Sequence, residues 1–260
     1  MSFRNRLLKI EENLNYIKIK FFVEQTYVNT KIINSDFLFT YQIDYITFNE
    51  PINTTKYEYD PNGYKFTVGG ERIGFIHFKS KPNNLSRLFE NISIISEIDM
   101  NMLDTTYVTS MDEMCLGCVN LKKIDLFNCS AENLLTTINM FNSCSNLEQV
   151  NFGSYNNSKF KPNKLTDIRN MFNWCINLQS IDMTSFNLYS VQTFGYTWGN
   201  CHKLNEIKIN SEINESAIIS QIILYDSHSL NAKFYYNSQH DISKIIAVAP
   251  SNWTFIQQEY

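Results

Sequence analysis

Apolar residues return at fixed intervals through the middle of the chain, which is the pattern of an internal repeat. The most regular position is usually a cysteine, and it steps along the chain by 26, 26, 31 and 26 residues. The longer step fits a five-residue insertion within 153–162, where the sequence GSYNNSKFKP is rich in turn-forming residues. The residues that mark the five repeats are Ile92, Cys118, Cys144, Cys175 and Cys201.

Each repeat carries two kinds of apolar spacing. Its last apolar residues follow the pattern L-x-x-I-x-L, which places the final two on one face of a short strand, because side chains alternate along a strand. Upstream, apolar residues fall three apart, the spacing of one helical face. We therefore predict that each repeat is a helical turn, a tight corner and a short strand. The upstream residues include Val108, Met111 and Met114, and the leucines of the strand pattern are Leu121, Leu147, Leu178 and Leu204.

One repeat alone buries too few apolar side chains to offset the backbone entropy lost when it becomes ordered. Stacking covers both open faces of each repeat, so five repeats are expected to lie side by side with parallel strands about 4.8 Å apart. The sequence thus predicts one concave parallel sheet over residues 81–210.

Residues 1–80 are rich in β-branched and aromatic residues and predict a β-rich segment or domain; the alternative is that they only extend the cap of the repeats. Its expected elements are a short helix from Phe3 to Leu14 capped by Ser2, strands at Tyr16–Val23 and Phe37–Phe48, and an antiparallel meander over Lys56–Phe78.

Residues 211–260 are expected to close the other end of the stack. Their pattern indicates a strand, a helix and a strand, with Asp241 as the helix N-cap and Pro250 ending the helix. This segment is predicted to be a C-terminal αβ cap.

The repeats share the pattern M-F-x-x-C-x-x-L-x-x-I-D, seen most clearly from Met140 and Met171. Over Leu85–Asn210 the chain resembles the BspA-like leucine-rich repeats of bacterial surface proteins. That resemblance implies a leucine-rich-repeat solenoid and, commonly, adhesion or binding to a host protein. Together with the spacing it predicts an α/β fold: a short solenoid with a parallel sheet, a β-rich N-terminal segment and the C-terminal αβ cap.

Composition and charge narrow the expected partners and the expected cellular location. The 260 residues carry a net charge of −4 with a pI near 5.6, which argues against nucleic-acid binding. No apolar run reaches the roughly 20 residues of a membrane span, and the first residues lack the uncharged core of a signal peptide. Synthesis in the cytoplasm is therefore expected, with a virion or the cell surface reached by a non-standard route. The six cysteines are expected to be free thiols.

The sequence predicts no enzyme, no cofactor and no metal site. Cys115 and Cys118 have C-x-x-C spacing, but zinc needs two further ligands, and both fit small buried hydrophobic residues better. Cys201 and His202 are adjacent in sequence, and adjacent residues on an extended segment point apart, so they do not form a thiol and base pair. None of the common catalytic motifs occurs.

Polar residues between the buried columns form the candidate binding face. They make a mildly acidic stripe that could meet a basic protein patch, a cation or a sugar, and the alternative is an ordinary solvated sheet face. The insertion offers a second contact through Tyr155 and Phe160, whose rings could instead fold back onto the core. The candidate residues of the face are Glu97, Asp99, Lys123, Asp125, Phe127, Asn151, Asp182 and Lys208.

Two roles fit these features. The first is non-enzymatic recognition of a host or partner protein, with adhesion through the repeat face. The second is a structural component of a bacteriophage particle, associated with its tail or fibre and assembled in the cytoplasm. In both the partner is a protein, and the sequence leaves the oligomeric state open.

Overall fold

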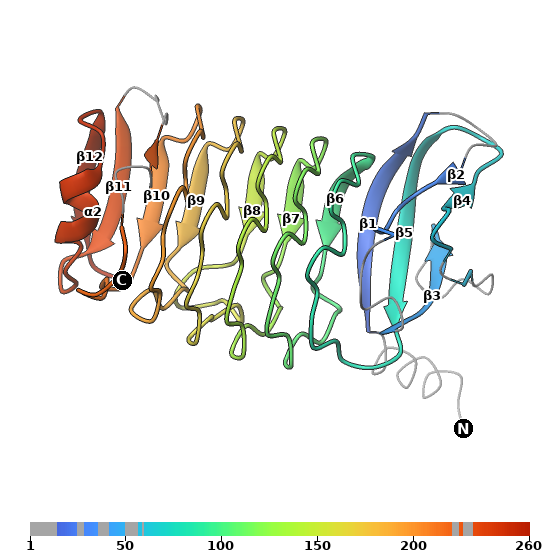
Figure 1. The fold of residues 1–260 in the computed structure, drawn as a ribbon, viewed down its shortest axis with the longest axis horizontal. Coiled ribbons are helices and arrows are strands. Elements are labelled where there is room, and N and C mark those ends of the chain that lie inside the picture. Colours follow the sequence, from blue (N-terminus) through green and yellow to red (C-terminus); the bar gives the residue numbers. More distant parts are fainter. Residues whose placement is uncertain are drawn as a thin grey trace.

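The computed structural model describes residues 15–24, 29–35, 42–49, 57–58, 60–219, 224–225 and 231–260. The expected helix over Phe3–Leu14 with its cap Ser2 lies outside these residues, as does the first part of the expected strand Phe37–Phe48. The described chain is a row of strands that runs from the N-terminal segment, through the repeats, to the C-terminal segment (Figure 1).

The first sheet joins the N-terminal segment to three repeats. It has six strands in the order β3-β5-β1-β6-β7-β8, antiparallel from β3 to β6 and parallel from β6 to β8. A separate two-stranded ladder pairs β2 with β4. The bounds are β1 Tyr16–Val23, β2 Asn29–Thr30, β3 Ile43–Phe48, β4 Tyr64–Lys65, β5 Gly70–Phe78, β6 Ile95–Asp99, β7 Lys123–Asp125 and β8 Gln149–Asn151.

The N-terminal strands cap the repeats by extending their sheet. β1 pairs antiparallel with β6 of the first repeat, so that Ile19 lies opposite Ile98 and Lys20 opposite Glu97. Alternating residues of β1, such as Ile17 and Ile19, are fully buried. The open edge of the first repeat is thereby hydrogen-bonded instead of facing solvent.

The second sheet contains the last two repeats and the C-terminal segment. Its four strands are parallel, in the order β12-β11-β10-β9, and the helix α2 connects β11 to β12. The helix begins one residue later than predicted: its N-cap is Ile242, while the Asp241 side chain accepts a hydrogen bond from the Ser243 backbone N–H at 2.8 Å. The bounds are β9 Ser180–Met183, β10 Glu206–Ile209, β11 Ala232–Asn237, α2 Ser243–Val248 and β12 Trp253–Gln258.

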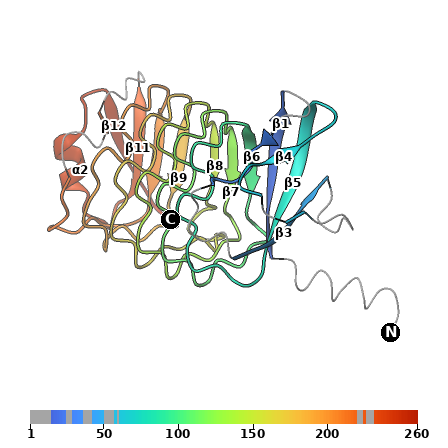
Figure 2. The same ribbon diagram turned by 45° about the vertical axis from the view of Figure 1, so that its right-hand side comes forward.

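The predicted α/β fold class, a leucine-rich-repeat solenoid on one parallel sheet, is wrong. The described chain is mostly β-sheet, its larger sheet is mixed, and α2 is the only helix among the described residues. The apolar residues spaced three apart lie in consecutive turns and not in a helix. Figure 2 shows these turns as loops running beside one another along the repeats.

Hydrogen bonding explains why these turns do not become helices. The backbone N–H groups of Glu113 and Cys115 donate to carbonyls of the next repeat, Ile138 at 2.8 Å and Met140 at 2.9 Å, and the intervening Met114 donates to Met111 within its own turn. Only part of the backbone is therefore available for helical bonds. Two positions of each repeat also have positive φ, which a helix excludes.

The apolar columns of the sequence form the core. Leu121, Leu147, Leu178 and Leu204 are all fully buried and belong to one continuous cluster. The strands of these repeats do not form one sheet, however, because the ladder stops between β8 and β9.

The insertion accounts for this break. Phe160 is fully buried, with its ring 4.9 Å from that of Phe152 and 5.5 Å from that of Phe186, and so adds an aromatic ring to the core between the third and fourth repeats. On the other side of the same repeats the backbone stays paired, with the Phe141 N–H donating to the Met171 carbonyl at 2.9 Å. The two repeats are therefore joined along their turns and separated along their strands.

Candidate functional site

The structure brings the predicted polar columns into register within each sheet. In the first sheet, Glu97 lies opposite Lys123 and Asp99 lies opposite Asp125. In the second sheet, Asp182 lies opposite Lys208, which in turn lies opposite Tyr235 of β11. The expected continuous stripe is thus two shorter patches, separated where the ladder stops.

The acidic column is the set of polar residues at or near the ends of strands β6 to β9, and it has a local structural role. Its members are Asp99, Asp125, Asn151 and Asp182. One side-chain oxygen of each member accepts a hydrogen bond from the backbone N–H two residues later and holds the turn that follows the strand. Asp182 also accepts the hydroxyl of Thr184 at 2.6 Å. The turn bonds are Asp99 to Asn101 at 3.0 Å, Asp125 to Phe127 at 3.0 Å, Asn151 to Gly153 at 3.0 Å and Asp182 to Thr184 at 2.9 Å.

A hollow of about 410 Å³ lies on the first sheet where the N-terminal strands meet the first two repeats. Three lysines and four carboxylates line it, so its charges nearly balance. Four of the predicted residues take part, and β1 and β5 supply the others, which sequence reasoning missed. Its charged residues are Lys18, Lys20, Glu71, Glu97, Asp99, Lys123 and Asp125.

Lys20 links the two parts of this hollow. Its Nζ lies 3.2 Å from Oε1 of Glu71 on β5 and 3.3 Å from Oε1 of Glu97 on β6. The hydrogen bonds to Glu71 and Glu97 raise the pKa of Lys20. The alternation of Lys18 and Lys20 with buried isoleucines was visible in the sequence, but only the pairing of β1 with β6 places these lysines beside the acidic columns.

The predicted aromatic contacts have different fates. Phe160 is fully buried, so of the two alternatives for its ring the packing against the core is the one observed. Tyr155 of the same insertion is 47% exposed. Phe127 is partly buried and its ring lies over Gly153, where an added Cβ would come within 2.8 Å of it. Tyr155 is therefore the accessible ring among the three.

The C-terminal residue lies at the second patch, beside β10 and β11 (Figure 1). The Lys208 Nζ lies 3.0 Å from Oε1 of Glu206 and 5.6 Å from the ring centroid of Tyr235. Burial and the carboxylates of Asp182 and Glu206 raise the pKa of Tyr260 to about 12. Lys208 is thus paired with Glu206, and the Tyr260 phenol lies near the carboxylates of the patch.

The cysteine column is structural. Each thiol donates a hydrogen bond to a backbone carbonyl of the preceding repeat. The same carbonyl also accepts the backbone N–H of the residue that occupies the cysteine position in that preceding repeat. The four bonds run from Cys118 to Phe89 at 2.9 Å, from Cys144 to Cys115 at 3.0 Å, from Cys175 to Phe141 at 3.1 Å and from Cys201 to Phe172 at 3.0 Å.

These thiols are poor nucleophiles. Burial raises the pKa of Cys201 to about 12 and the pKa of Cys115 well above its ordinary value. His202 is exposed and its ring lies against that of Trp174, with centroids 6.2 Å apart, whereas the Cys201 thiol faces the Phe172 carbonyl in the core. The adjacent pair therefore does not bring a base to a thiol.

Within the described ranges no three His, Cys, Asp or Glu side chains gather in a way that could hold a metal ion. Of the helical segments that the structure describes, none has the length and apolar character needed to cross a bilayer.

The chain is thus a β-rich repeat protein with a charged sheet face. A family model described as "Mycoplasma protein of unknown function, DUF285" matches residues 83–211 and 155–238, which together span more than half of the chain. The chain belongs to this family. No curated protein and no solved structure matches it.

Proposed function

We propose that this protein is a non-enzymatic recognition module that binds a partner protein through the charged hollow on the first sheet. The observation that carries the proposal is the set of alternating charges held on four adjacent strands, with Lys20 bridging Glu71 and Glu97. Strands fix these side chains more firmly than loops would, and a rigid array of both signs favours one partner orientation over others.

The balance of charge points to a protein partner. Nucleic acid requires a surface on which lysine and arginine outnumber carboxylates, and here three lysines face four carboxylates. A protein surface, in contrast, can present the complementary mixture of signs.

The more specific part of the proposal is a BspA-like repeat protein that attaches to a host or partner protein. Its support is the shared M-F-x-x-C-x-x-L-x-x-I-D pattern and the regular stacking of the buried columns that this pattern produces. Attachment at the cell surface is the setting that this resemblance favours.

Charge reversal at Lys123 tests the proposal. Lys123 is exposed and lies between Glu97 and Gln149 in the register, so Lys123→Glu changes the face without opening the core. Binding of labelled protein to host cells or to an isolated host protein is expected to weaken about tenfold, equivalent to ~1.4 kcal/mol.

Lys164→Glu is the matched control, because it makes the same change of charge at an exposed lysine whose Nζ contacts Asn133 and does not line the hollow. Binding should also weaken as ionic strength rises. Equal binding by the two variants, or binding that is insensitive to salt, would contradict the proposed face.

One observation favours a second candidate function, assembly into a larger particle such as that of a bacteriophage. β12 forms an edge of the second sheet and contains no charged residue and no proline, the features that commonly block pairing at an edge. Sedimentation of the native material distinguishes the two: assembly requires the chain to travel with other particle proteins, and a chain that sediments alone excludes it.

A further inference from the structure

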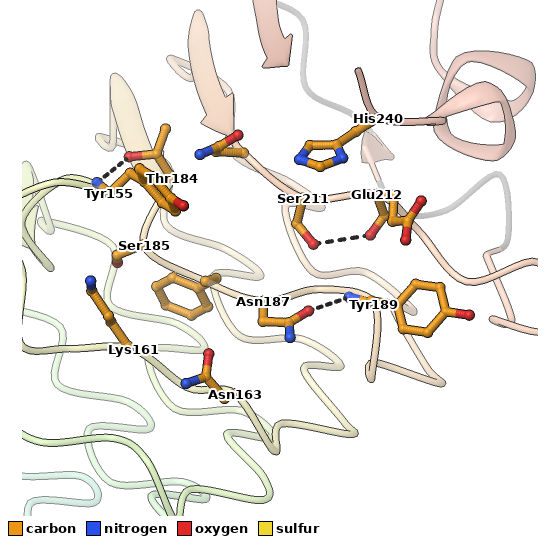
Figure 3. Close-up of a pocket in the computed structure, with 12 residues that line it drawn as sticks. Tyr155, Lys161, Asn163, Thr184, Ser185, Asn187, Tyr189, Ser211, Glu212 and His240 are labelled. Carbon is orange, nitrogen blue, oxygen red and sulfur yellow. Dashed lines mark hydrogen bonds between the residues drawn. The ribbon is translucent and has the colours of Figure 1, made fainter. Parts of the chain in front are cut away.

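A second hollow, separate from the charged face, lies at the carboxyl ends of β9 and β10 and has a volume of about 400 Å³ (Figure 3). Three segments that are distant in the sequence build it: the insertion, the turn after β9 and the turn after β10, with His240 from the segment after β11. The insertion that interrupts the sheet thus also forms one wall of this hollow.

Aromatic side chains stand on opposite sides of the hollow. Tyr155 and Lys161 of the insertion lie on one side and Tyr189 on the other (Figure 3). Tyr155 is 47% exposed and Tyr189 is 49% exposed, so each offers ring surface to solvent. The Lys161 Nζ lies 5.8 Å from the ring centroid of Tyr155, which steadies that wall.

Asparagine side chains with an unused amide N–H₂ group line the same hollow. The Oδ1 of Asn187 accepts the Tyr189 N–H at 3.1 Å and the Oδ1 of Asn210 accepts the Asn237 amide at 2.8 Å, which leaves both Nδ2 groups available to a ligand. The Asn163 side chain, from the residue just after the insertion, also lines the hollow.

The Ser185 hydroxyl also borders the hollow. Ser185 is only 5% exposed, and among the described residues its Oγ has no hydrogen-bond partner. A buried hydroxyl without a partner is unfavourable, and such groups are commonly satisfied by water or by a ligand.

The charges of the hollow are balanced, with Lys161 on one side and Glu212 on the other (Figure 3). A strongly charged ligand would therefore meet a like charge on one wall. The only large aliphatic or phenyl side chain in the lining, Phe186, is 2% exposed, so the hollow lacks the open apolar floor that anchors a protein side chain.

We propose that this hollow binds a neutral saccharide. A sugar ring has an apolar C–H face that fits a tyrosine ring and a rim of hydroxyls that both donate and accept hydrogen bonds. The asparagine amides, the Ser185 hydroxyl and the imidazole of His240 provide the matching donors and acceptors. This binding does not depend on the proposed protein contact at the charged face.

Saturation-transfer NMR on the full chain tests the proposal. The probes are methyl β-galactoside, maltose and diacetylchitobiose as neutral sugars, with N-acetylneuraminic acid as the charged comparison. Transfer to ring C–H protons of at least one neutral sugar is expected. Absence of transfer to all three, or transfer to the charged sugar alone, would overturn the proposal.

Asn187→Asp locates the binding. The aspartate keeps the Oδ1 that holds the Tyr189 turn and replaces only the Nδ2 donor, and binding is expected to weaken about tenfold. Asn84→Asp is the control, because Asn84 makes the same kind of turn bond to the Ser86 N–H, at 2.7 Å, in the first repeat. Equal affinity of the two variants would place the sugar elsewhere and overturn the assignment.

Removal of an aromatic wall gives a second test. Tyr189→Ala should weaken binding about tenfold, whereas Tyr107→Ala, at a tyrosine that is also exposed and does not line the hollow, should leave it unchanged. In the unaltered protein the ring protons of His240 should shift on titration with the sugar, a readout that needs no variant. Unshifted His240 resonances, or a Tyr189→Ala variant that loses binding to a partner protein and not to sugar, would overturn the saccharide site.

Discussion

Substitutions at Asp182 separate the structural role of the acidic column from its charge. Asp182 accepts two hydrogen bonds from Thr184, one from its N–H at 2.9 Å and one from its hydroxyl at 2.6 Å. The same position is Asn151 in the preceding repeat, where the amide oxygen accepts the Gly153 N–H at 3.0 Å. Asparagine therefore supports this turn without a negative charge.

The expected magnitudes follow from these contacts. Hydrogen bonds to a charged group contribute about 1.5–3 kcal/mol each when one partner is removed. Because Asp182 is partly exposed, we expect the combined loss of its two bonds to Thr184 to lie near the lower end of that range. Asp182→Ala should therefore reduce the free energy of unfolding by about 2 kcal/mol. Asp182→Asn keeps the oxygen acceptor and should cost about 0.5 kcal/mol or less.

Urea unfolding followed by circular dichroism measures the difference. With a slope of about 2.5 kcal/mol per M, the Ala variant should unfold at a midpoint about 0.8 M lower and the Asn variant close to the unaltered protein. If Asn destabilises as much as Ala, the negative charge and not the hydrogen bond holds the turn. If Ala has no effect, the turn does not need the side chain, and the structural role assigned to this column is wrong.

Three further predictions concern the core. Cys144→Ala removes the thiol bond to the Cys115 carbonyl and a buried sulfur, and calorimetry should show a loss of about 2 kcal/mol; an unchanged melting temperature would contradict the role of the thiol ladder. Cys201 should resist a thiol reagent at pH 8 in the folded protein and react once urea unfolds it. The pKa of Cys201 is raised from 9.0 to about 12 in the folded protein, so its contribution to stability is present below about pH 9 and is lost as pH rises toward 12. Alkaline unfolding monitored by fluorescence should show this loss. If the loss is absent, the thiol is accessible to solvent. Phe160→Ala should destabilise by about 3–5 kcal/mol in urea unfolding, whereas Tyr155→Ala in the same insertion should be nearly neutral, and equal effects would refute the packing assigned to the insertion.

The sequence identified the residues of the charged hollow only in part. Glu97, Asp99, Lys123 and Asp125 were predicted to lie on one face, and the register places Glu97 beside Lys123 and Asp99 beside Asp125. The lysines of β1 were not predicted to join them, because no periodicity relates residues separated by 77 positions, as Lys20 and Glu97 are. Pairing between distant strands is decided by which sheet edge is left open.

The second hollow was also outside the reach of the pattern. The sequence marked Tyr155 as a possible contact and left the direction of the insertion open, whereas Tyr189, Ser185 and His240 gave no signal. Their proximity results from the turns that follow β9 and β10, which bring neighbouring repeats together at the carboxyl ends of their strands.

The sequence by itself determined the repeat length and the buried columns, because these depend on a spacing that recurs in every repeat. The tertiary structure decided the fold class. Residues three apart satisfy a helix and a stacked turn equally well, and the choice depends on whether the backbone donates within its own turn or to the next repeat, as Cys115 does to Met140. It also decided where the sheet ends, because a ring inserted between two repeats separates strands that the spacing alone would pair.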